Sequence, residues 1–120
     1  MDVIDWINVA IAFVTIAFGA IGWLAPGYTM KTVDLKDGGS SMGQSEVRAA
    51  SGALFVMAGL GALLISTPGA YAMVGFIWAG GALGRVTSLV VDGRTRKKWI
   101  FFGTEIVVAA VALWLNLPLI

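Results

Sequence analysis

Two charged residues interrupt apolar segments of this chain, and their types suit an ion pair. Arg85 stands seven positions before the next charged residue, Asp92, which is about 10 Å along a helix. Glu105 stands six positions after Trp99, near the start of the last apolar segment, or about 9 Å along a helix. In consecutive antiparallel helices the two charges would lie at nearly equal depth. Because the planar guanidinium group suits a carboxylate, we predict a buried salt bridge between Arg85 and Glu105.

Other polar residues near the ends of the apolar segments extend this pair into a candidate ionic cluster. Its predicted members are Arg85, Glu105, Glu46, Arg48, Ser88 and Asp92. Spacing alone does not choose among Glu46, Asp92 and Glu105 as the carboxylate that Arg85 prefers. Two interpretations stay open. The cluster either locks the helices together, or forms a cytoplasm-facing polar pocket that binds an anion, a lipid headgroup or a substrate, or relays protons.

The sequence lacks the residues on which most catalytic and metal-binding sites depend. The chain has no histidine and no cysteine, which excludes imidazole catalysis, thiolate chemistry, disulfides and histidine ligation of haem. The carboxylates of Glu46, Asp92 and Glu105 could perform acid–base work or hold a hard cation. No Ser-His pair, HExxH motif or phosphate-binding loop accompanies them. We therefore expect a non-catalytic protein without cofactor or metal, and the net charge of +1 gives no indication of nucleic-acid binding.

The composition indicates that membrane-spanning helices position these residues. Of the 120 residues, 58% are hydrophobic and 12% are charged, whereas soluble domains carry about 25% charged residues. A helix needs about 20 apolar residues to cross a bilayer. Four segments reach this length, at residues 6–25, 47–66, 70–91 and 99–117. We predict an all-α fold, a bundle of four transmembrane helices that forms a single domain over residues 1–120.

The connections between the four segments differ in length. A short turn at Pro68-Gly69 joins the second and third segments into an antiparallel hairpin. Residues 26–45 form the longest connection, which we expect to be a loop that begins where Pro26-Gly27 ends the first helix. Ser41 and Gln44 are candidates for a capping box at the start of the second helix.

Basic residues of the connections indicate an orientation in the membrane. They all fall in or beside connections 26–45 and 92–98, as Lys31, Lys36, Arg48, Arg94, Arg96, Lys97 and Lys98. The positive-inside rule places both connections in the cytoplasm and both termini outside it. We expect the run Arg94, Arg96, Lys97 and Lys98 to determine this topology and to attract anionic headgroups, which makes membrane lipids the first expected partners.

Glycines recur where helices are expected to pack. Lipid provides no hydrophobic drive between helices, so small residues that let backbones approach take that role. The predicted packing positions are Gly52, Gly59, Gly80, Gly81 and Gly84. The Gly80-x-x-x-Gly84 spacing could serve another helix of the same bundle or a second protein.

Three stretches together resemble one family of membrane proteins. They are "SEVRAASG" from Ser45, "GGALGRVTSLVVDG" from Gly80, and the last segment around Glu105. In these features the chain resembles the small bacterial membrane proteins grouped as domain of unknown function 4345. The resemblance implies a four-helix membrane fold and, with the charge bias, a multi-pass protein of the bacterial inner membrane. It implies no activity.

The small size, short connections and glycine faces favour a role in membrane-protein assembly over ligand binding. We predict an accessory or assembly subunit that packs against a larger membrane complex or forms a homo-oligomer. The alternative is a binder or transporter of a small anionic or amphipathic ligand, which would use the Arg/Glu pocket.

Overall fold

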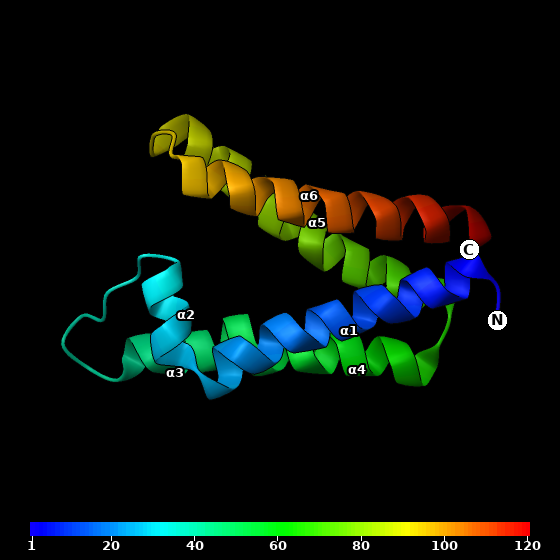
Figure 1. The fold of residues 1–120 in the computed structure, drawn as a ribbon, viewed down its shortest axis with the longest axis horizontal. Coiled ribbons are helices and arrows are strands. Elements are labelled where there is room, and N and C mark those ends of the chain that lie inside the picture. Colours follow the sequence, from blue (N-terminus) through cyan, green and yellow to red (C-terminus); the bar gives the residue numbers. More distant parts are fainter. The chain divides into compact units, whose positions relative to one another are not determined.

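The computed structural model describes residues 1–120, and every regular element in it is helical (Figure 1). No strand is present, so the all-α prediction is confirmed. In chain order the elements are α1 (Val3–Leu24), α2 (Pro26–Thr32), α3 (Met42–Arg48), the π-helical turn η1 (Ala49–Ala53), α4 (Leu54–Ile65), α5 (Pro68–Val91), α6 (Arg96–Asn116) and the 3-10 turn η2 (Leu117–Leu119).

Four helical stretches are long and apolar enough to cross a membrane, as the sequence predicts. They are Val3–Leu24, the continuous stretch Met42–Ile65, Pro68–Val91 and Arg96–Leu119. Since these stretches contain few charges and run for 22 to 24 residues, they indicate a multi-pass membrane protein.

Local capping explains why these helices begin earlier than predicted. Asp2 and Asp5 each accept a hydrogen bond from the other's backbone N–H at 3.0 Å, so α1 begins at Val3. The hydroxyl oxygen of Thr95 accepts from the N–H of Lys98 at 3.2 Å, so α6 begins at Arg96. The basic residues expected in a loop therefore lie partly in the first turn of α6.

The connection at residues 26–45 contains a helix that we did not predict. Pro26 ends α1 as expected, but it also occupies the first position of α2, where its missing N–H and fixed φ are favourable. The predicted capping box at the start of α3 is wrong, because the Ser41 side chain makes no cap hydrogen bond. A bond from the Met42 N–H to the Ser40 hydroxyl, at 3.3 Å, is present instead.

The chain divides into two compact units. One contains Met1–Asn8 and Ile65–Ile120, and we call it the hairpin unit, because α5 and α6 form most of it. The other contains Val9–Leu64, and we call it the α1–α4 unit. A single four-helix domain stays a prediction.

In the α1–α4 unit, helix α1 packs backbone to backbone against the stretch from η1 to α4. A Cβ added at Gly52 would lie 2.5 Å from the backbone nitrogen of Trp23. One added at Gly59 would lie 2.7 Å from the carbonyl oxygen of Ala12, and one at Gly19 would lie 2.6 Å from the nitrogen of Val56. Any side chain at these positions would force the helices apart.

In the hairpin unit, α5 and α6 pack against each other around mostly small and medium-sized side chains and one tryptophan. Val74, Trp78 and Leu89 of α5 and Ala109 and Ala112 of α6 are buried. The start of α1 joins this core through a reciprocal pair of side-chain amides. Asn8 and Asn116 each donate to the other's Oδ1 at 2.8 Å, and Asn116 also donates to the Ala112 carbonyl at 2.7 Å.

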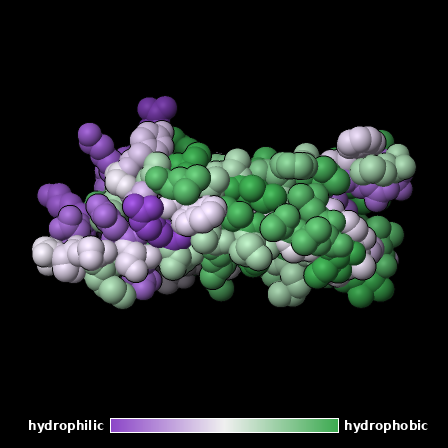
Figure 2. Space-filling view, turned by 90° about the horizontal axis from the view of Figure 1, so that it is seen from below, coloured by the Kyte–Doolittle hydropathy of each residue, from purple (hydrophilic) through white to green (hydrophobic).

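Large apolar side chains remain exposed along the helices, as lipid contact requires. Leu64, Val90 and Trp114 are among the most exposed of them. Figure 2 shows hydrophobic residues along the helices that face the viewer, and hydrophilic residues at the end that holds the α2–α3 connection. Soluble monomers rarely expose so much contiguous apolar surface.

Candidate functional site: an ion pair on the α5–α6 hairpin

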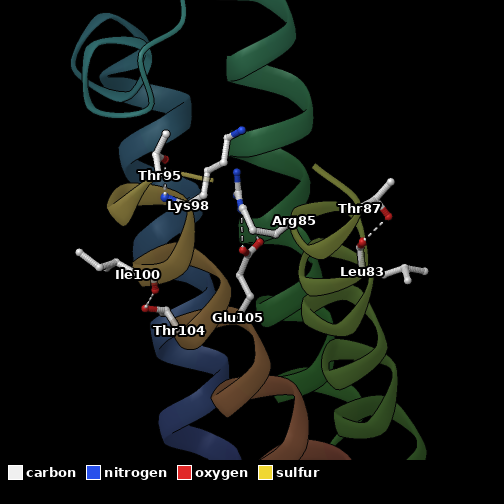
Figure 3. A network of polar contacts seen from close by, with 8 residues as sticks. All are labelled: Leu83, Arg85, Thr87, Thr95, Lys98, Ile100, Thr104 and Glu105. Carbon is white, nitrogen blue, oxygen red and sulfur yellow. Dashed lines mark hydrogen bonds and ion pairs between the residues drawn. The ribbon is translucent and has the colours of Figure 1, made fainter. Parts of the chain in front are cut away.

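Arg85 of α5 and Glu105 of α6 form an ion pair in the hairpin unit, as their matching depths in the sequence predict. Nε of Arg85 donates to Oε1 of Glu105 at 3.0 Å, and Nη2 donates to Oε2 at 3.4 Å. Figure 3 shows the two side chains pointing toward each other from the two helices. Two donors of the guanidinium group thus bond the two oxygens of the carboxylate.

Two neighbours shape the pair. A Cβ added at Gly81 would lie 2.5 Å from Oε2 of Glu105, so only a glycine leaves the carboxylate its present position. On the other side, the Cζ atom of Arg85 lies 5.2 Å from the ring centroid of Phe101, within cation–π range. Phe101 was not predicted as part of this site, although it precedes Glu105 by four positions and therefore shares its helix face.

The ion pair is only partly buried, which corrects the expectation of a buried salt bridge. The Arg85 side chain is 34% exposed and that of Glu105 is 15% exposed. Two helices alone cannot surround a guanidinium group. Glu105 lies over Gly81 between them, whereas Arg85 extends toward the end of the hairpin where Lys98 stands (Figure 3).

Asp92 and Ser88 lie on the same unit but do not bond the guanidinium. Ser88 is a half-buried residue of the last turns of α5, and Asp92 is the exposed C-cap of that helix. The Nζ of Lys98 donates to the backbone carbonyls of Asp92 and Gly93, at 3.4 and 2.8 Å. Gly93 has a φ of +92°, which favours glycine at the exit from α5. Glu105 is therefore the carboxylate that holds Arg85 in this unit.

Glu46 and Arg48 belong to the α1–α4 unit, where both are exposed on α3. Arg48 bonds a backbone group instead of a carboxylate: its Nη1 donates to the carbonyl oxygen of Trp23 at 2.7 Å. This carbonyl lies in the last turn of α1, where helices leave acceptors without intrahelical partners. The six predicted cluster residues are thus divided between the two units.

The remaining predicted residues are placed as follows. Arg96, Lys97 and Lys98 start α6, and Arg94 precedes it as an exposed residue. Gly80 and Gly84 lie on an exposed face of α5, and a Cβ added at either would meet no atom of its unit within 4 Å. No group of three or more Asp or Glu side chains is arranged to hold a metal ion.

Comparison with known proteins assigns the chain to a family. Neither the curated proteins nor the solved structures gave a match. The family model described as "Domain of unknown function (DUF4345)" matches residues 3–116, which is nearly the whole chain. The protein, with four helices suited to spanning a membrane and an Arg85–Glu105 pair on its last two helices, belongs to the domain of unknown function 4345 family.

Proposed function

We propose that this protein is a small non-catalytic membrane subunit that packs against a larger membrane complex or a second copy of itself. It would lie in the bacterial inner membrane as a four-helix bundle, with both termini outside the cytoplasm. The bias of basic residues toward connections 26–45 and 92–98 supports this orientation.

The outer face of α5 carries the proposal. Exposed residues recur on it at alternating spacings of three and four, as Met73, Phe76, Gly80, Leu83, Thr87 and Val90. Gly84 lies beside this row, and neither it nor Gly80 meets a neighbour within its own unit. By contrast, Gly75 on the inner face of α5 would place a Cβ 2.9 Å from that of Ala112. Glycines on an outer face allow another helix to approach closely.

The polar contacts of the hairpin unit also support a structural role. Arg85 and Glu105 bond each other, and so do Asn8 and Asn116. Side chains that bond one another across two helices hold those helices in register.

A substitution at Gly84 tests this proposal. After mild extraction, the wild-type protein should migrate on a native gel with a heavier complex. Gly84→Leu should abolish this migration, because the leucine would hold the partner helix away. Gly103→Leu is the matched control, since an added Cβ there also meets nothing within 4 Å but lies on α6. A wild-type protein that runs as a lone monomer, or equal migration of both variants, would refute the proposal.

A second candidate function rests on the partial exposure of Arg85. A guanidinium that is 34% exposed can reach an anion beside Glu105. The ligand would be a small anionic or amphipathic molecule, and a short-chain alkyl phosphate can serve as the probe. It should bind the wild type and Arg85→Lys but not Arg85→Ala. If Arg85→Ala retains its helical circular dichroism and binds equally well, this alternative is excluded.

A further inference from the structure

An open groove of about 490 Å³ lies in the α1–α4 unit, and neither Arg85 nor Glu105 lines it. It is lined by Trp23 of α1, by Ser41 at the start of α3, by Gln44, Ser45 and Arg48 of α3, and by Ala49 and Ala53 of η1. One cation and several hydrogen-bonding side chains line this groove, and no carboxylate does. We call it the Arg48 groove.

Spacing along α3 gathers the polar residues of the groove on one side of the helix. Ser41, Gln44, Ser45 and Arg48 stand at i, i+3, i+4 and i+7. Residues at this spacing share a helix face. Ser41 does not cap α3 with its side chain, so its hydroxyl is available to the groove.

Arg48 is anchored on one side of its guanidinium group. Its Nη1 bond to the Trp23 carbonyl fixes the side chain against the end of α1. A guanidinium has five N–H donors, and this bond uses one of them. A second acceptor with several oxygens, such as a phosphate, can therefore bind Arg48 without displacing the Trp23 carbonyl.

The floor of the groove leads onto an apolar helix face. Ala49 and Ala53 belong to η1, which packs so closely on the end of α1 that a Cβ at Gly52 would lie 2.7 Å from the Cα of Trp23. Met57 follows Ala53 by four positions in α4 and is 62% exposed. Polar donors at the end of an apolar helix face match the two parts of a phospholipid, its headgroup and its acyl chains.

We propose that the Arg48 groove binds the phosphate of an anionic phospholipid, with Arg48 as its cation. The hydroxyls of Ser41 and Ser45 and the amide of Gln44 donate further hydrogen bonds to the headgroup. The acyl chains extend from Ala53 toward Met57. The Arg48 groove includes none of the basic residues at 94–98, whose attraction for anionic lipids is unspecific.

Native mass spectrometry can test the groove with defined lipids. The protein is purified in micelles that contain equal amounts of dioleoyl phosphatidylglycerol and dioleoyl phosphatidylcholine. The wild type should retain one phosphatidylglycerol molecule in preference to phosphatidylcholine. Arg48→Gln and Gln44→Glu should each reduce this preference about five-fold, the effect of one charge near an anionic headgroup. Gln44→Glu leaves the bond from Arg48 to the Trp23 carbonyl possible, so it tests binding even if Arg48→Gln perturbs the fold.

Lys36→Gln is the matched control, because it lowers the net charge by one, as both test variants do, at an exposed residue outside the groove. It should retain the wild-type preference. Equal losses in all three variants, or no preference in the wild type, would overturn the proposal. A soluble anion is the other source of phosphate. If inorganic phosphate without lipid raises the wild-type melting temperature as much as phosphatidylglycerol does, and Arg48→Gln removes both effects, the lipid assignment is wrong.

Discussion

The hairpin unit contains two polar side-chain pairs, and they differ in burial and in charge. The Arg85–Glu105 ion pair is 34% and 15% exposed, whereas Asn8 and Asn116 are 4% and 0% exposed. Both pairs use a residue of α6, and each joins it to another helix. The unit thus buries its neutral pair completely and leaves part of its charged pair uncovered.

The chemistry of the two pairs explains this difference. Two facing amides each offer a donor and an acceptor, and here each satisfies the other, while Asn116 also bonds the Ala112 carbonyl. Burying such a pair costs little free energy, because its polar groups stay hydrogen-bonded. A carboxylate and a guanidinium lose much more hydration free energy on burial, and their mutual attraction offsets only part of that loss. Partial exposure lets Arg85 keep that solvation toward the end of the hairpin.

The comparison predicts that the amide pair contributes more to stability than the ion pair. Asn116→Ala should lower the free energy of unfolding by about 1–3 kcal/mol, because it leaves the amide of Asn8 buried without its partner. Unfolding in mixed detergent micelles measures this change. The double variant with Asn8→Ala should cost less than the two single variants added together, since both break the same bonds. Additive losses would show that the amides do not act as a pair.

The apolar spans and the Arg85–Glu105 pair were predictable because each depends on position along a single helix or hairpin. Hydropathy identifies the four spans. Because a short connection joins α5 to α6, distance from that connection predicts which residues of the two helices lie at the same depth. The pairing of Asn8 with Asn116 was not predicted, although both were polar residues in apolar helices. They are 108 positions apart, and no local pattern joins them.

Other features leave no clear signal in the sequence. Arg48 bonds a backbone carbonyl, and every residue offers such an acceptor, so its type and spacing placed it in the ionic cluster without indicating this bond. The π-helical turn at Ala49–Ala53 lies where Gly22 and Trp23 of α1 closely contact Ser51 and Gly52. Small residues allow that contact, but they equally allow a regular α-helix.

Neutralising the carboxylate of the ion pair should have a smaller effect than breaking the amide pair. Glu105→Gln keeps a hydrogen-bond acceptor for Arg85 and removes the charge. Since Arg85 is partly solvated, we expect a loss of about 1 kcal/mol or less in the same unfolding experiment. Glu46→Gln, at an exposed carboxylate of α3, is the control and should change little. A loss at Glu105 that exceeds the loss at Asn116 would reverse the comparison and make the ion pair the main lock of the hairpin.

The smallest effect should come from adjacent glycines of α5. Gly80→Ala and Gly81→Ala both replace glycine in a helix interior, which favours the helix by roughly 0.5–1 kcal/mol. In the chain separated from any partner, a Cβ at Gly80 meets no atom within 4 Å, whereas one at Gly81 lies 2.5 Å from Oε2 of Glu105 and displaces that carboxylate. Gly80→Ala should therefore stabilise the protein by a few tenths of a kcal/mol more than Gly81→Ala, within the range of one weak ion pair. In the Glu105→Gln background the amide can turn away from Arg85 at little cost, so the difference between the two glycine variants should shrink. An unchanged difference would mean that Gly81 accommodates the bulk of the side chain at position 105 and not its charge.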